Sequence, residues 1–253
     1  MCPAYSSAKH TYLFIMKRFI LSNCYIFCLL LIFNPCFATW SIIVADSKTK
    51  KIGIAGASCT HSVYGIGAIV PGKGAIVVQA MSNGVARLDG FRMIMEGATA
   101  ADVLTKIKGP YYNPEEQQYA ILCMNDLKNA AVYTGSNTHG FGGTLTGNGV
   151  SVQGNTLTNK NVIQAVFDAA QKAQRDSLPV EDILMLALAA GAEAGGDKRC
   201  GEKKASSAFL TVSKANDRDE HWLNLVIYGK NDQSNAVDAL HEKFILWKKE
   251  PGH

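Results

Sequence analysis

Acidic residues are absent from the first 38 positions of this chain, where three basic residues lie. Charged residues make up only 18% of the whole chain and apolar residues 47%, which excludes the composition of disordered proteins. No stripe of lysine, arginine and aromatic residues follows position 38, so we expect no nucleic-acid partner. The long apolar run, residues 19–33, is shorter than the ~20 residues of a comfortable membrane span.

The first 38 residues have the order of a secretory signal. The basic pair Lys17 and Arg18 precedes the apolar run, an Asn-Pro pair interrupts that run, and small residues occupy the third and last positions before Thr39. This pattern predicts a signal peptide over residues 1–38, cleaved directly before Thr39. An uncleaved signal anchor is the alternative that the pattern leaves open.

Cleavage would leave residues 39–253, an exported domain that is either periplasmic or secreted. Its 215 residues (253 less 38) are enough for one well-buried core, and we expect a single domain without a stable membrane span. Loss of the three basic residues leaves 22 lysines and arginines against 21 acidic residues, so the mature domain is nearly neutral. Met16 opens the more regular part of the signal, and we interpret it as the true start.

Beyond residue 38, groups of strands alternate with groups of helices. Strands are predicted over residues 39–46, 51–57, 75–81, 119–125, 130–134, 150–155, 206–212 and 223–228. Helices are predicted over residues 85–96, 99–107, 161–174, 180–190 and 234–247. Residues 140–149 contain five glycines and are predicted to form a loop. This grouping indicates an α+β fold in which helices cover antiparallel sheets.

The histidines and cysteines do not indicate a metal centre, and we expect neither a metal nor another cofactor. Four histidines lack the spacing of metal ligands: His61, His139, His221 and His241. Cys123 lies in an apolar run and is expected in the core. Cys59 and Cys200 are the candidate disulfide pair, with three buried thiols as the alternative.

Thr39 would combine a hydroxyl and a free amine on one residue. A threonine hydroxyl needs a base within hydrogen-bond reach before it acts as a nucleophile. The α-amino group of the same residue can be that base, because its usual pKa of about 7.7–8.0 leaves a good fraction neutral near physiological pH. Many exported proteins begin with threonine by chance, but Thr39 starts a buried-looking strand, whereas mature termini are usually loose.

Several ordered motifs carry a resemblance to a known family. They are residues 39–46 (TWSIIVAD), 52–59 (IGIAGASC), 79–83 (QAMSN), 149–155 (GVSVQGN) and 194–197 (AGGD). Through them the mature chain resembles the domain-of-unknown-function 1028 family. The resemblance implies an N-terminal nucleophile hydrolase-like fold, a four-layer αββα sandwich with two antiparallel sheets. In familiar members the threonine directly follows the initiator methionine, and here signal cleavage would expose Thr39 in the same way.

The same motifs supply candidate partners for Thr39 in catalysis. Asn83 and Asn155 each end a strand beside a glycine, where an amide N–H could serve an oxyanion or hold a substrate amide. The alternative for both is that asparagine tolerates a left-handed turn. Gln153 is a candidate substrate-binding residue, with a structural hydrogen bond as its alternative.

Two further residues complete the candidate site. Asp197 could fix the α-amino group of Thr39 or bind a substrate cation, and a loop ion pair is its alternative. Ser58 ends the second predicted strand, where it could relay a proton or contact substrate, or act as a buried turn hydroxyl.

These residues predict a hydrolase of a C–N amide bond in a small-molecule or peptide-like substrate. Thr39 is the expected nucleophile, and an acyl-enzyme is the expected intermediate. The alternative is a non-catalytic protein of the same fold that binds a small molecule or acts as an envelope interaction module. The apolar residues 244–247 near the C-terminus favour a homo-oligomer.

Overall fold

The computed structural model describes residues 39–138, 140–229 and 232–250, which form an α+β fold with two antiparallel sheets. The predicted signal peptide and His139 lie outside the described residues. The larger sheet has the strand order β10-β9-β2-β1-β8-β7. Its strands are β1 (Thr39–Ala45), β2 (Ile52–Ser58), β7 (Phe141–Gly147), β8 (Val150–Leu157), β9 (Ser207–Ser213) and β10 (Leu223–Ile227). The smaller sheet has the order β3-β4-β5-β6, with β3 (Gly67–Val70), β4 (Gly74–Ala80), β5 (Gln117–Cys123) and β6 (Asp126–Thr134).

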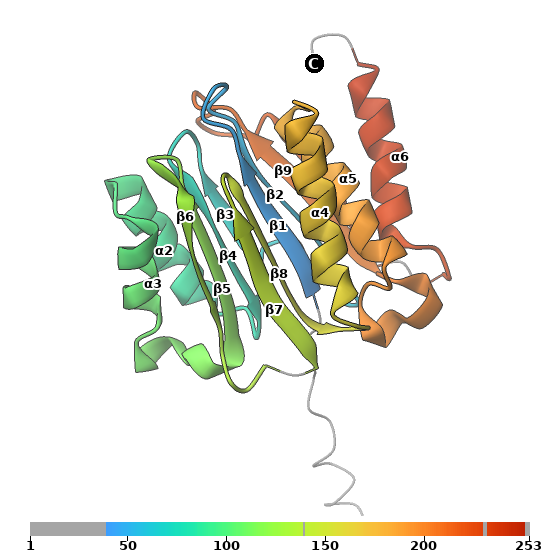
Figure 1. Ribbon diagram of the computed structural model, residues 1–253, viewed down its shortest axis with the longest axis horizontal. Coiled ribbons are helices and arrows are strands. Elements are labelled where there is room, and N and C mark those ends of the chain that lie inside the picture. The colour runs from blue at the N-terminus through green and yellow to red at the C-terminus, as the bar shows by residue number, and fades with distance from the viewer. Residues whose placement is uncertain (1–38, 139, 230–231, 251–253) are drawn as a thin grey trace, which may run out of the picture. The chain divides into compact units, whose positions relative to one another are not determined.

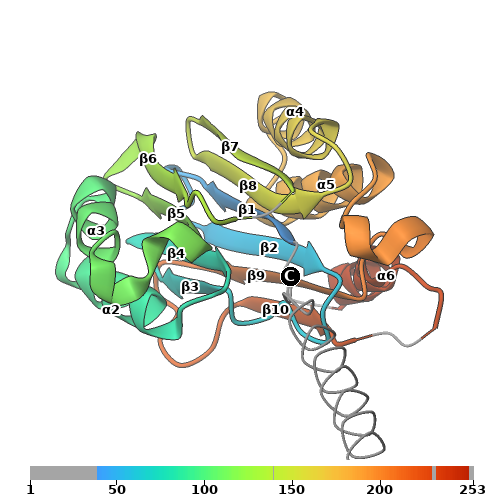
Figure 2. The ribbon, with the colours of Figure 1, turned by 90° about the horizontal axis from the view of Figure 1, so that it is seen from below.

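Helices cover the outer face of each sheet, so the layers follow the order helices, sheet, sheet, helices (Figures 1 and 2). Two helices pack on the smaller sheet: α2 (Gly84–Glu96) and α3 (Ala100–Ile107). Three pack on the larger sheet: α4 (Asn161–Arg175), α5 (Val180–Glu193) and α6 (Ala236–Lys248). This arrangement confirms the predicted α+β class and the two antiparallel sheets. No helix in the described part of the chain combines the length and apolarity needed to cross a membrane.

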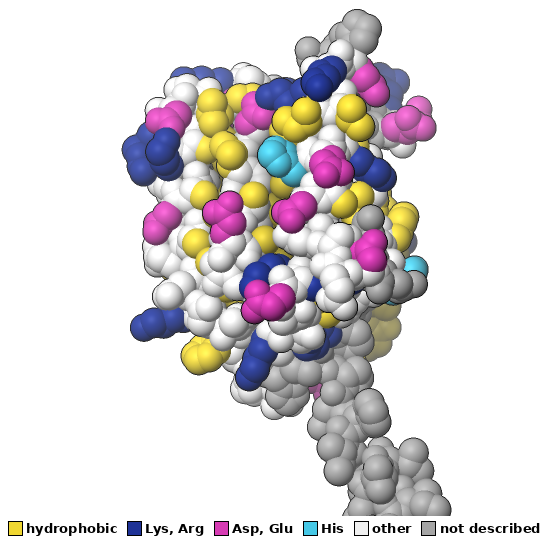
Figure 3. Space-filling model, turned by 90° about the vertical axis from the view of Figure 1, so that its right-hand side faces the viewer, with side chains coloured by type: hydrophobic (Ala, Val, Ile, Leu, Met, Phe, Trp, Pro, Cys, Tyr) yellow, Lys and Arg dark blue, Asp and Glu magenta, His cyan; other side chains and the backbone are white. Residues whose placement is uncertain are grey.

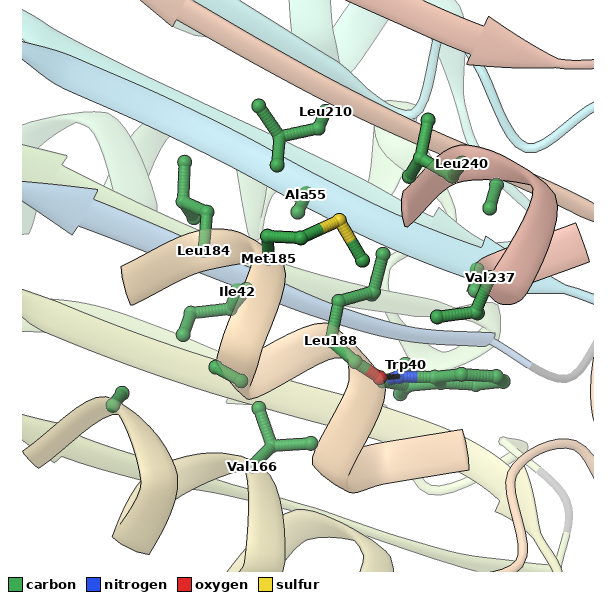
Figure 4. Close-up of a cluster of buried hydrophobic side chains, with 14 of the residues drawn as sticks. Trp40, Ile42, Ala55, Val166, Leu184, Met185, Leu188, Leu210, Val237 and Leu240 are labelled. Atoms are coloured by element: carbon green, nitrogen blue, oxygen red, sulfur yellow. Dashed lines mark hydrogen bonds between the residues drawn. The ribbon is translucent and has the colours of Figure 1, made fainter. Parts of the chain in front are cut away.

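The central strand β1 is buried on both faces, as its continuous apolar run predicted. Trp40 and Ile42 point toward the helices (Figure 4), and together with Val44 they join the core beneath α4 and α5. The Trp40 indole donates to the carbonyl of Leu188 at 3.3 Å. Helix α5 can come this close because Gly191 faces the indole, where a Cβ atom would lie 2.5 Å from Trp40 Nε1. The packing of α5 therefore fixes the position of β1.

The prediction of a loop over residues 140–149 is wrong, because β7 occupies most of this segment. Its glycines allow close approach to neighbouring backbone: a Cβ on Gly142 would lie 2.9 Å from the carbonyl oxygen of Gly154. The Asn148-Gly149 turn then leads into β8, with Gly149 at a φ of +73°. An Asn-Gly pair is a strong hairpin signal, and it could have revealed this strand. Strand β3 was likewise not predicted from its glycine-rich segment.

The cysteines occupy the predicted positions. Cys59 and Cys200 form a disulfide across 141 residues of sequence, with their Cα atoms 5.5 Å apart. Cys123 is a free, buried thiol on β5. Burial raises the pKa of this thiol to about 11, so it is protonated at neutral pH.

The C-terminal segment expected to favour oligomers divides between core and surface. Phe244 is buried, whereas Ile245 is 41% and Leu246 62% exposed. On the face where α6 lies, apolar side chains alternate with acidic and basic ones rather than forming one continuous apolar area (Figure 3). A homo-oligomer through this segment stays a prediction.

Candidate functional site at the start of the central strand

Three of the predicted site residues meet at one end of the larger sheet. Thr39 starts β1, and the strand register places it opposite Ser58 of β2 and Asn155 of β8. Directly opposed side chains lie on the same face of a sheet, here the face toward the second sheet. Thr39 is 5% exposed, and the other two are 1% exposed. The Thr39 hydroxyl donates to Ser58 Oγ at 3.3 Å.

A hydrogen-bonded chain leads from Thr39 through Ser58 to an ion pair whose carboxylate is buried. The Arg199 guanidinium donates to Ser58 Oγ at 3.2 Å and to Asp197 at 2.7 Å, and its Nε donates to the second carboxylate oxygen at 3.1 Å. Asp197 is fully buried and also accepts from the backbone N–H of Cys59 at 2.6 Å. Asp197 therefore forms the loop ion pair that was one of its expected roles, and it orients Arg199.

The disulfide joins the two segments that carry this chain of contacts. Cys59 follows Ser58 directly, and Cys200 follows Arg199. The bond therefore holds the end of β2 against the segment that brings Arg199 to Ser58. A cross-link that closes so long a loop stabilises a fold by several kcal/mol, on the order of 2–5.

A second polar cluster fills the space between the two sheets behind Thr39. Ser41 donates to Gln79 Oε1 at 2.6 Å and accepts from Gln153 Nε2 at 2.7 Å. Gln79 in turn donates to Gln118 Oε1 at 2.8 Å. All four side chains are at most 1% exposed. Gln153, expected to bind substrate, is thus part of an internal network, and this is the structural role named as its alternative.

The hydrogen bonds of Gln118 decide which way the Asn155 amide points. Gln118 Nε2 donates to the carbonyl oxygens of Gly143 and Gly154 at 3.2 and 3.0 Å, and these can only accept. Gln118 Oε1 therefore faces Asn155 and accepts from its Nδ2 at 3.2 Å. Asn155 Oδ1 is left buried and has no hydrogen-bond partner among the described residues. Asn155 thus offers an acceptor on the side away from Gln118, where an oxyanion site would need a donor.

Asn83 has a different surrounding from Asn155. It caps helix α2: its Oδ1 accepts from the N–H groups of Val85 and Ala86, both at 3.0 Å. Its Nδ2 donates to the carbonyl of Tyr112 at 3.0 Å. Its φ of −62° is not left-handed, so Asn83 does not have the predicted turn role. Its amide nitrogen is already engaged, so it is not a free donor for an oxyanion either. The structure does not place Asn83 against Thr39.

A pocket of about 310 Å³ opens beside Thr39. Thr39 and Ser58 line it together with further polar side chains: Thr60, Ser62, Ser82 and Arg87. Ala80 and Ser82, which also border it, have φ values of +67° and +51°. Non-glycine residues in this region are strained, and such strain concentrates at functional sites. A larger pocket, about 460 Å³, lies at the other end of β1 beside Asp46 and contains none of the predicted site residues.

Sequence reasoning missed both arginines at this site. Arg199 had a weak signal, because it follows Asp197 by two positions and precedes Cys200. Arg87 had none, because it lies in an ordinary helix, and only the packing of α2 brings it to the pocket. In the described part of the chain, no group of three or more histidine, cysteine or acidic side chains is placed to hold a metal ion.

The fold and the site define an α+β protein of two antiparallel sheets between helices, with a polar cluster around the first residue of a central strand. The chain belongs to the family of unknown function DUF1028, which matches residues 39–238. It is similar in fold to the crystal structure of a protein of this family from Silicibacter pomeroyi, with a TM-score of 0.70 and 24% identity over 85% of this chain and 88% of that one. No curated protein matches the chain.

Proposed function

We propose that the mature protein is an N-terminal nucleophile amidohydrolase in which Thr39, exposed by signal cleavage, attacks a C–N amide bond. The position of the Thr39 hydroxyl carries this proposal: it borders a pocket and is hydrogen-bonded at the start of a buried central strand. A nucleophile held by a rigid strand needs no ordering before reaction. The family match also begins at Thr39, which supports a special role for this residue.

The proposed reaction uses the two functional groups of Thr39. Hydrolysis of the peptide bond before Thr39 converts its amide nitrogen into an α-amino group. The neutral amine accepts the hydroxyl proton while Oγ1 attacks the substrate carbonyl carbon. The C–N bond then breaks, the leaving amine takes this proton, and an ester forms on Thr39. Water, deprotonated by the same amine, attacks the ester and releases a carboxylic acid and the free hydroxyl.

We assign Asn155 to the amine rather than to the oxyanion. Its Nδ2 already donates to Gln118, and its Oδ1 is a buried acceptor opposite Thr39. A new α-amino group would bring additional N–H donors to this end of β1, and one of them could satisfy the Asn155 oxygen. Ser58, held by Arg199, would keep the Thr39 hydroxyl oriented toward the pocket.

The test starts with secretion of the full chain, followed by N-terminal sequencing and intact-mass measurement of the product. We expect Thr39 as the first residue. A panel of amino-acid p-nitroanilides, N-acyl amino acids and dipeptides is then screened for amide hydrolysis. Thr39→Ala should lower the rate by about 1,000-fold or more, because no other group of this site replaces the nucleophile.

Thr49→Ala is the matched control, because Thr49 lies in the turn at the other end of β1 and bonds to Asp46. It should retain the wild-type rate. The mechanism is wrong if the mature terminus is another residue, or if Thr39→Ala or a form that keeps Ala38 hydrolyses the panel at the wild-type rate. Binding without turnover by the wild-type protein would favour the non-catalytic alternative.

A further inference from the structure

Arg87 is a partly buried cation on the wall of the pocket that contains Thr39. It also lines an adjoining pocket of about 260 Å³, with Tyr64 and Gly65 common to both. The guanidinium therefore stands where the two pockets meet. Burial lowers the pKa of Arg87 below its usual value, although an arginine stays protonated at any physiological pH.

Two other cations whose side chains are partly withdrawn from water have carboxylate partners. Lys51 pairs with Glu181 at 3.0 Å, and Arg199 pairs with Asp197 at 2.7 Å. Within residues 39–138, 140–229 and 232–250, no acidic side chain forms an ion pair with Arg87, and no side chain or backbone group accepts a hydrogen bond from its guanidinium. A desolvated charge without a partner is unfavourable, so a bound anion would stabilise this arrangement.

The location of Arg87 in helix α2 adds to the positive charge. It lies in the first turns of the helix, near the positive end of the helix dipole, and the first turn contains no acidic residue. The helix N–H groups that would hold a phosphate are partly used, because Asn83 caps those of Val85 and Ala86. A single guanidinium with few free N–H groups suits a monoanion such as a carboxylate better than a phosphate ester.

We propose that Arg87 binds a carboxylate of the substrate, so that the Thr39 pocket accepts amides that carry a carboxylate, such as N-acyl amino acids and short peptides with a free C-terminus. This substrate class rests on the proposed amidohydrolase function. The carboxylate is held in the planar fork of Arg87 while the amide carbonyl faces the Thr39 hydroxyl in the same pocket. Hydroxyl groups of Thr60, Ser62 and Ser82 supply polar contacts between these two ends.

The test measures binding in the absence of turnover, using the mature Thr39→Ala protein. Saturation-transfer NMR and isothermal titration compare a set of N-acetyl amino acids with the corresponding neutral carboxamides and with a phosphate monoester. We expect the carboxylates to bind best. Arg87→Gln should weaken their binding by roughly 10- to 100-fold, because it removes charged hydrogen bonds between the guanidinium and the carboxylate. It should leave carboxamide binding unchanged. Arg87→Lys should recover part of the affinity, because it restores the charge but not the fork.

Arg92→Gln is the matched control, because Arg92 lies on the same helix, is mostly exposed and pairs with Asp89 at 3.7 Å. It removes the same charge and should leave carboxylate binding unchanged. Without ligand, Arg87→Gln should melt at the wild-type temperature or slightly above it, because it removes an unpaired cation. A melting temperature several degrees lower would assign Arg87 a structural role and overturn the proposal.

The remaining outcomes separate this inference from the proposed reaction. Carboxylate binding that depends on Arg87, combined with no hydrolysis by the wild-type protein, supports the inference and contradicts the amidohydrolase. Hydrolysis that depends on Thr39 but is equal for carboxylates and carboxamides supports the enzyme and overturns the inference. Three other results also overturn the inference. They are an equal loss of carboxylate affinity in Arg87→Gln and Arg92→Gln, tighter binding of the phosphate monoester than of the carboxylates, and no carboxylate binding at millimolar concentration.

Discussion

The space between the two sheets has an apolar half and a polar half, although the same strands line both. At the end of β1 near Ala45, the inward side chains are aliphatic, among them Ile43, Ile54 and Leu122. Near Thr39 the same strands turn hydroxyl and amide side chains inward. These are Ser41, Ser58, Gln79, Gln118, Gln153 and Asn155. Both halves are almost completely buried, so exposure to water does not explain the difference.

The two halves contribute to the molecule in different ways. The apolar half stabilises the fold by removing surface from water, at about 25 cal/mol per Å², and it tolerates changes of shape. The polar half adds little net stability, because its hydrogen bonds replace hydrogen bonds to water. Each of its groups must nevertheless find a specific partner, so the network determines positions. The network contacts Thr39 directly, because Ser58 accepts from its hydroxyl at 3.3 Å and Gln79 donates to its carbonyl at 3.5 Å.

The largest loss of stability should come from Gln118→Leu. This change keeps the approximate volume of the side chain but removes the amide that connects most of the hydrogen bonds in the polar half. It removes the bond that Gln118 donates to the Gly154 carbonyl and the bonds that it accepts from Gln79 and Asn155, and we expect a loss of about 5 kcal/mol in the free energy of unfolding. Urea unfolding measures it. Leu122→Ala in the apolar half is the control. It should lower the free energy of unfolding by about 3 kcal/mol and leave the Thr39 pocket unchanged. A loss below about 1 kcal/mol for Gln118→Leu would refute this connecting role of the amide.

Removal of the disulfide should have the next largest effect. The double variant Cys59→Ala/Cys200→Ala should lower the free energy of unfolding by about 3 kcal/mol, because the unfolded chain regains the freedom of a long loop. It should also release Arg199 from Ser58 and lower any activity that depends on Thr39. Thermal unfolding and the hydrolysis assay measure the two effects. Unchanged activity in the folded double variant would show that Arg199 keeps its position without the disulfide.

The Asn155 acceptor allows a test that depends on the state of the N-terminus. Asn155→Leu should destabilise the mature protein by about 1–2 kcal/mol more than a form that retains residues before Thr39, because only the mature form would contain an ammonium donor for Oδ1. Paired urea titrations of the two forms measure the difference. Equal losses would contradict the contact between Asn155 and the amine.

The smallest effect is expected from treating Cys123 with a thiol reagent. Its side chain lies on the outward face of β5. Its raised pKa, about 11, and its burial should keep the thiol unmodified by iodoacetamide at pH 8 in the folded protein. Modification should follow the unfolded fraction when urea is added. Mass spectrometry provides the readout. Rapid labelling of the native protein would show that the helices over this face open more readily than the packing indicates.

Local patterns predicted most of the fold, and the two missed strands share one physical property. Helix α3 has the expected Thr99 cap, completed by Asp102 in a reciprocal capping box. Strands β3 and β7 are both edge strands, each paired on one side only. Edge strands bury less side-chain surface, so they need fewer apolar residues, and their glycine-rich sequences resemble loops.

The candidate site was only partly predictable. Thr39 begins a strand, Ser58 ends one and Asn155 lies near the end of a third, all in recognisable motifs, and the structure brings these three together. Asn83 also follows a strand, but the sequence pattern could not distinguish a turn residue from the cap of the helix that follows. Arg87 and Arg199 were missed because their neighbours at the pocket belong to distant segments of the chain.

The sequence by itself determined which side chains alternate along β1 and that Thr99 caps helix α3, because these properties depend on neighbours a few positions away. It also determined that Thr39 begins a buried strand. Only the tertiary structure decided that Thr39 faces Ser58, Asn155 and a pocket lined by Arg87. Strand register and helix packing bring together residues that are more than a hundred positions apart in the sequence. No local pattern specifies those pairings.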